Sequence, residues 1–142
     1  MIEKENTVSS DLIYTGKTVS LRVDTVEVPN KGYQKREIVE HNGVVAVIAI
    51  TEDNKIILVK QYRKSIEDVV LEIPGGKLEL NENPRECAIR EFRKKTGYDA
   101  ESFKLIHKFY PSVGFSNQMI FIYLAKKLEK LEDKQEEQQI EI

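Results

Sequence analysis

Two glycines, several glutamates and an arginine stand at fixed intervals in the middle of the chain, in a pattern suited to diphosphate chemistry. Gly75 and Gly76 come first, Glu82 follows, and the pair Arg90-Glu91 comes next. Hydrolysis of a phosphoanhydride needs cations that neutralise developing charge and activate water. Carboxylates three or four residues apart on a helix project from one side and can bind Mg²⁺ or Mn²⁺ together. A double glycine lets the backbone come close and offer a carbonyl as a further ligand.

Two lysines interrupt this acidic pattern. Lys94 and Lys95 lie three and four residues after Glu91, on the flank where further carboxylates would complete a metal site. An ammonium group repels a divalent cation but is a good point-charge partner for phosphate. We therefore expect both lysines to contact the phosphates of a bound ligand.

The helix that must carry these residues has clear start and stop signals. Asn83 is suited to the N-cap, Pro84 to the first helical position, and Glu86 to the third, as in a capping box. Gly97 can end the helix with a positive φ. These residues predict a helix over positions 84–96.

Strands surround this helix in the sequence. The alternating segments 20–28 and 33–39 flank a Pro29–Gly32 turn and predict a β-hairpin. Residues 44–50 are continuously apolar, which is typical of a strand buried on both faces. Further strands are expected over residues 55–60, 69–73, 103–110 and 119–124. The predicted fold class is therefore α/β with a sheet-led core.

Length and composition predict one ordinary globular domain. The chain has 142 residues, and its formal charge of −2 gives no reason to propose nucleic acid or a membrane surface as a partner. No apolar run approaches the roughly 20 residues that span a bilayer. The single Cys87 excludes an internal disulfide and indicates a reducing cytoplasm.

The stretch from Gly76 to Tyr98 resembles the Nudix box, in which a glycine, a glutamate and an Arg-Glu pair stand at these intervals. Seven of its nine fixed positions match, and the two that differ hold Lys94 and Lys95 in place of glutamates. The resemblance implies an enzyme that uses Mg²⁺ or Mn²⁺. The two lysines oppose the binding of such a metal.

The resemblance also assigns roles by position. Glu91 matches a metal-binding glutamate, and the carbonyl of Gly75 matches a backbone metal ligand. Glu82 matches the early glutamate of the box, and Arg90 the arginine that orients glutamates through an ion pair. Glu82, Arg90 and Glu91 are thus the expected catalytic set, impaired by the neighbouring lysines.

Segments outside the box narrow the resemblance to the ADP-ribose pyrophosphatase branch. They are Lys35–Val39, Lys60–Arg63 and Leu71–Lys77. The branch implies that Arg63 contacts a phosphate and that Glu72 positions the nucleoside.

Three further positions take their expected roles from the same branch. Arg36 and Glu37 are expected to reach a ligand across a dimer interface. Gln118 stands where the branch has a glutamate that acts as general base or metal ligand. An amide cannot accept a proton at neutral pH, so Gln118 is expected at most to contact the ligand.

The resemblance implies a Nudix-type α/β/α sandwich with a mixed sheet and an N-terminal β-hairpin extension. We expect a single Nudix domain over residues 1–142, in which residues 1–40 form a hairpin for dimerisation and residues 41–142 form the core. The C-terminal helix of the family is expected to be missing, because the sequence ends about where that helix would begin.

Three functions are compatible with these residues. The first is binding of a nucleoside diphosphate-linked small molecule such as ADP-ribose, by a cytoplasmic homodimer whose hydrolytic activity is weak or lost. The second is an active, metal-dependent nucleoside-diphosphate-sugar pyrophosphatase that recruits Glu79, Glu82 or Glu86 together with Glu91. The third is a scaffold whose site is vestigial.

Overall fold

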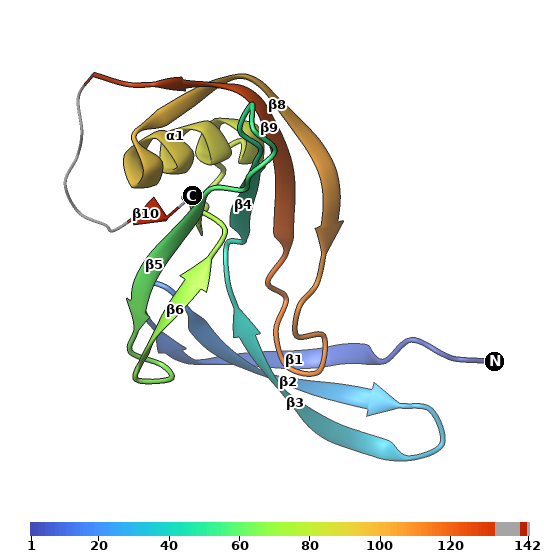
Figure 1. Ribbon diagram of the computed structural model, residues 1–142. Coiled ribbons are helices and arrows are strands. Elements are labelled where there is room, and N and C mark those ends of the chain that lie inside the picture. Colours follow the sequence, from blue (N-terminus) through green and yellow to red (C-terminus); the bar gives the residue numbers. More distant parts are fainter. Residues whose placement is uncertain (133–139, 142) are drawn as a thin grey trace. The chain divides into compact units, whose positions relative to one another are not determined.

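A computed structural model describes residues 1–132 and 140–141 of the chain. The residues fall into two compact units. One comprises residues 1–41 and 110–119, and the other comprises residues 42–109 and 120–142. Figure 1 shows the strands of both units and the helix of the second unit.

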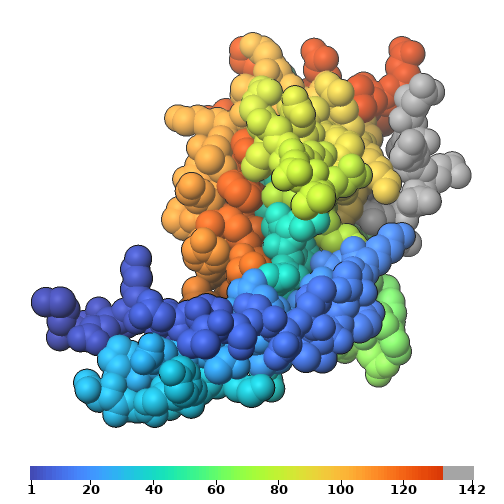
Figure 2. Space-filling view, turned by 180° about the vertical axis from the view of Figure 1, so that it is seen from behind, coloured from blue at the N-terminus to red at the C-terminus, as the bar shows by residue number. Residues whose placement is uncertain are grey.

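The first unit contains a three-stranded antiparallel sheet in the order β1-β2-β3. Its strands are β1 (Asn6–Thr15), β2 (Ser20–Val28) and β3 (Gly32–Glu40). The predicted hairpin is confirmed as β2 and β3. β1 is a third strand that the sequence does not predict, because its segment lacks strict alternation of polar and apolar residues. All of its residues are exposed. Figure 2 shows the β1 side chains along the viewed face of this sheet.

A buried carboxylate holds β1 against β2. Asp24 of β2 accepts hydrogen bonds from Ser10 Oγ of β1 at 2.7 Å and from Arg22 Nε at 2.9 Å. Arg22 also forms an ion pair with Glu40 of β3. Since a buried carboxylate is costly without partners, these bonds specify how the three strands pair.

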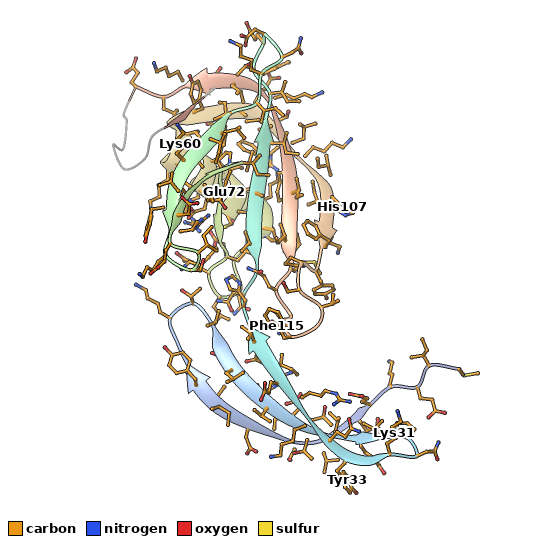
Figure 3. The ribbon with its side chains drawn as sticks, turned by 60° about the horizontal axis from the view of Figure 1, so that its bottom comes forward. Lys31, Tyr33, Lys60, Glu72, His107 and Phe115 are labelled. Atoms are coloured by element: carbon orange, nitrogen blue, oxygen red, sulfur yellow. The ribbon has the colours of Figure 1, made fainter. Side chains whose placement is uncertain are left out.

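The loop of residues 110–119 is hydrogen-bonded to the end of β3. Val39 donates its N–H to the carbonyl of Phe115 at 2.7 Å, and its own carbonyl accepts from Asn117 N–H at 3.2 Å. Figure 3 labels Phe115 in this loop, and Lys31 and Tyr33 at the turn between β2 and β3.

The second unit contains a mixed four-stranded sheet in the order β7-β4-β9-β8. Its strands are β4 (Val44–Ala49), β7 (Gly75–Lys77), β8 (Tyr98–Phe109) and β9 (Ile120–Lys130). β4 and β9 are parallel, and the other pairs are antiparallel. A smaller antiparallel sheet has the order β10-β5-β6, with β5 (Leu58–Arg63), β6 (Asp68–Glu72) and β10 (Ile140–Glu141). The predicted α/β class with a mixed sheet is confirmed.

Several predicted strand boundaries are corrected by the structure. β8 and β9 are both longer than expected, because polar residues at their ends pair in the register from Tyr98↔Lys130 to Phe109↔Ile120. The segment predicted over residues 55–60 is β5 over residues 58–63. β4 is fully buried only at alternate residues, so one of its faces is half-buried rather than sealed.

The helix α1 (Pro84–Thr96) begins and ends where the sequence predicts. Asn83 Oδ1 accepts from the N–H groups of Arg85 at 2.9 Å and Glu86 at 3.3 Å, and Gly97 has a φ of 69°. Its fully buried Phe92 packs edge-on against Phe103 of β8, with ring centroids 5.7 Å apart. α1 therefore lies on the four-stranded sheet (Figure 1). No helix in the described part of the chain is long and apolar enough to cross a bilayer.

The N-cap gives a first prediction. Asn83→Ala removes the acceptor of two backbone N–H groups, so the free energy of unfolding should fall by about 1 kcal/mol. Urea denaturation followed by circular dichroism measures this loss. Asn83→Asp keeps the acceptor and should retain most of the stability. An equal loss in both variants would show that the cap oxygen is unimportant.

Candidate functional site

The site is built where β7 meets α1. Gly75 and Gly76 pair with Ala46 and Val45 of β4. A Cβ on Gly75 would overlap the carbonyl oxygen of Val45, so the two backbones approach more closely than any side chain allows. The double glycine is thus the start of the short strand β7.

Gly76 makes room for a carboxylate. A Cβ on this residue would overlap Cγ, Cδ and Oε2 of Glu91. Glu91 is only 8% exposed and lies on the face of α1 that meets β7. The sequence pattern did not predict this contact; the only signal for it is that the second glycine stands in a segment able to form a strand.

Arg90 organises the acidic residues of the site. Its Nε lies 3.0 Å from Glu82 Oε1 and its Nη2 lies 3.0 Å from Glu82 Oε2, while Nη1 pairs with Glu91. Glu82 also accepts from the backbone N–H of Glu79 at 2.9 Å. The Arg90 hydrogen bonds, with that of Glu79, lower the pKa of Glu82. The bond to Glu82 likewise raises the pKa of Arg90.

Cys87 lies beneath this group and has a structural role. Its Sγ is 3.5 Å from the carbonyl oxygen of Lys77 and 3.5 Å from Arg90 Nη2. Burial, with the charge of Glu82 beside it, raises the pKa of the thiol to about 12. The thiolate, which is the nucleophile, is therefore not formed near neutral pH.

The β5–β6 hairpin contributes a second ion pair. Arg63 Nε lies 2.7 Å from Glu72 Oε2, and both side chains are partly exposed. Figure 3 labels Glu72 on β6 and Lys60 on the neighbouring β5. Two residues expected to contact different parts of a ligand are thus bound to each other in the structure.

Charges from both ion pairs act on Lys95, whereas Lys94 is exposed. Lys94 is exposed and Lys95 is half-buried. Burial lowers the pKa of Lys95, while the charges of Glu91 and Glu72 raise it and that of Arg63 lowers it. The structure therefore brings three predicted site residues, Glu91, Arg63 and Glu72, close enough for their charges to act on the Lys95 ammonium.

The two carboxylates at the centre of the site are paired with a protein cation. Mg²⁺ and Mn²⁺ need several oxygen ligands, and residues 1–132 with 140–141 contain no group of three or more His, Cys, Asp or Glu side chains that could hold an ion. Glu82 and Glu91 are both held by Arg90, and the Lys95 ammonium acts on Glu91.

Three predicted site residues belong to the other unit. Arg36 is bound through both Nε and Nη2 to Glu5, at 2.9 and 2.5 Å, and Glu37 is exposed on the same strand. Gln118 donates its backbone N–H to Ser116 Oγ at 3.1 Å. Their roles stay predictions.

Comparisons with known proteins agree with this architecture. A family model described as the NUDIX domain matches residues 40–142. The chain is 48% identical over 130 residues to the methanol dehydrogenase activator of Bacillus methanolicus, covering 92% of this chain and 70% of that protein. It is 46% identical over 133 residues to the ADP-ribose pyrophosphatase of Bacillus subtilis, covering 94% and 72%.

Two more distant matches extend the comparison. The ADP-ribose pyrophosphatase of Mycobacterium tuberculosis is 35% identical over 126 residues, which are 88% of this chain and 61% of that protein. The crystal structure of an ADP compounds hydrolase superposes with a TM-score of 0.82 at 18% identity, covering 99% of this chain and 79% of that one. At this identity the superposition shows the shared fold.

The contact between Gly76 and Glu91 gives a second prediction. Gly76→Ala should lower the free energy of unfolding by about 1–3 kcal/mol, because the added Cβ must displace the Glu91 carboxylate. Urea denaturation measures the loss. Gly114→Ala is the matched control, since nothing lies within 4 Å of a Cβ there. In a Glu91→Ala background the cost of Gly76→Ala should shrink, and an undiminished cost would contradict this contact.

Proposed function

The chain belongs to the Nudix family, and from this premise we propose that it binds a nucleoside diphosphate-linked small molecule of the ADP-ribose type, with hydrolysis weak or lost. The observation that carries the proposal is the half-buried Lys95 ammonium beside Glu91, the buried carboxylate of the site.

Electrostatics explains why hydrolysis should be weak. Nudix hydrolases generally use divalent metals. A dication 4 Å from an ammonium would be repelled by about 4 kcal/mol for each unit-charge pair at an effective dielectric constant of about 20. Because the metal both neutralises charge and activates the attacking water, a site that disfavours it loses both contributions.

The ligand class is supported by the relatives. Two similar proteins are named ADP-ribose pyrophosphatases, at 46% and 35% identity. In this chain, Arg63 is the candidate for a phosphate contact, and Glu72 is the candidate for positioning the nucleoside. A ligand phosphate would have to compete with Glu72 for the Arg63 guanidinium, which favours an anion of high charge such as a diphosphate.

One observation favours an active enzyme as the second candidate. The chain matches 72% of a protein named ADP-ribose pyrophosphatase at 46% identity. In that case Mg²⁺ or Mn²⁺ would have to be held by Glu91 with other glutamates of the box, such as Glu79 or Glu86. Glu82 is the least available of these, because Arg90 binds both of its oxygens.

We further propose that residues 1–40 form the dimerisation element of a single Nudix domain in a cytoplasmic homodimer. Within the first unit, β1 exposes four large apolar side chains by 59–62% each: Val8, Leu12, Ile13 and Tyr14. A second copy would cover this surface. It would also bring Arg36 and Glu37 to the partner's ligand.

The function is tested by measuring turnover and binding in parallel. ADP-ribose incubated with the protein and Mg²⁺ or Mn²⁺ should give no AMP above the blank without protein. ADP-ribose at about 100 times its Kd should stabilise the protein by about 2.7 kcal/mol in a thermal-shift experiment. Metal-dependent turnover would favour the enzyme instead, and absence of both signals would favour a vestigial scaffold.

Arg63→Ala refines this test. It should weaken binding of ADP while sparing adenosine, because only a phosphate contact is lost. Arg93→Ala is the matched control, since Arg93 also pairs with a carboxylate, Asp99 Oδ2 at 2.5 Å. Equal losses for ADP and adenosine would show that Arg63 acts structurally.

The dimer gives a separate prediction. Light scattering at micromolar concentration should give twice the 16.4 kDa mass of one chain. Leu12→Lys should shift the mass toward that of the monomer, because it places a charge in the proposed apolar interface. Lys104→Glu, at an exposed position of β8 outside residues 1–40, should leave it unchanged. A monomer at this concentration would contradict the proposal and remove Arg36 and Glu37 from any partner's site.

A further inference from the structure

The two adjacent lysines of α1 occupy different environments. Lys94 is exposed, so water and salt screen its charge. Lys95 is half-buried, and the charges of Glu91, Glu72 and Arg63 act on it. The structure therefore distinguishes two residues that the sequence presents as a pair.

The carboxylates of the site already have cationic partners. Glu72 is paired with Arg63 at 2.7 Å, and Arg90 pairs with both Glu91 and Glu82. Three carboxylates are thus matched by two guanidinium groups, and Lys95 supplies the third positive charge. Among the described residues, the three carboxylates and the three cations Arg63, Arg90 and Lys95 carry equal and opposite formal charge.

The Lys95 ammonium is attracted by two carboxylates but forms an ion pair with neither. Glu91 and Glu72 attract it, yet within residues 1–132 and 140–141 it joins neither in an ion pair. An ammonium has three donors and a flexible stem, and phosphate oxygens are strong acceptors for it. The group is therefore available to an anionic ligand.

We propose that the Lys95 ammonium takes the place of a metal cation in this site. It binds the diphosphate of the ligand directly, so that binding requires no divalent metal. This inference rests on the proposed function and deepens it. Arg63, on the facing hairpin, is the second cation within reach of the same diphosphate. Lys94 adds only a peripheral, salt-sensitive attraction.

Calorimetry with ADP-ribose as the probe tests the inference on the full chain. ADP-ribose should bind in EDTA, and saturating Mg²⁺ should change the Kd by less than about threefold. Binding that occurs only with Mg²⁺ or Mn²⁺ would overturn the inference while leaving the ligand class intact. Absence of binding under both conditions would instead refute the proposed function, and the inference with it.

Variants then identify which lysine binds the diphosphate. Lys95→Met removes the charge but keeps an unbranched side chain, and should weaken ADP-ribose binding in EDTA by about tenfold or more. Lys94→Met should cause a smaller loss that shrinks as salt is raised. Lys104→Met, at an exposed position of β8, is the matched control and should leave the Kd unchanged. Equal effects of Lys95→Met and Lys104→Met would overturn the inference.

Lys95→Glu provides an independent readout. It places a carboxylate four residues from Glu91 on the same flank of α1, which creates an anionic pair suited to a dication. In this variant ADP-ribose binding should become dependent on Mg²⁺, and Mg²⁺ alone should raise the melting temperature. Melting temperatures of all variants without ligand, compared with that of the unaltered protein, show whether each is folded. A folded Lys95→Glu variant that binds ADP-ribose equally well in EDTA would contradict the assignment.

Discussion

The buried Glu91 carboxylate, seated on Gly76 and paired with Arg90, is the contact on which the organisation of the site depends. It joins β7 to α1 at a point where the two elements could not come this close to each other if residue 76 had a side chain. Arg90 extends the same contact to Glu82, whose second partner is the backbone of the turn ahead of the helix. One guanidinium thus connects a strand, a turn and a helix.

In this arrangement, the role of the Nudix-box residues in folding is distinct from their role in catalysis. A carboxylate that is 8% exposed must be compensated, and either a metal or a protein cation can do so. Here Arg90 and the nearby Lys95 supply the positive charge. The Gly–Glu–Arg framework can therefore serve folding whether or not a metal binds.

Local signals predicted some elements well because their cause lies within a few residues. Asn83, Pro84 and Gly97 specify α1 through capping and φ preference alone, and the alternation of β2 and β3 is equally local. β1 escaped prediction because its ten residues are exposed, so it carries no apolar periodicity and is held by pairing with β2 and by Ser10–Asp24. β7 escaped because a Gly-Gly pair normally signals a turn, and only the close approach of β4 makes it a strand.

The site was predictable as a set of residues but not as an arrangement. Spacing placed Glu91, Lys94 and Lys95 on one helix flank, and family resemblance added Arg63 and Glu72. Which lysine is half-buried depends on how α1 packs against residues distant in the sequence, such as Phe92 against Phe103. A rotation of 100° between consecutive helical residues is enough to expose Lys94 while Lys95 is half-buried. Two identical residue types therefore differ in chemistry through the tertiary fold alone.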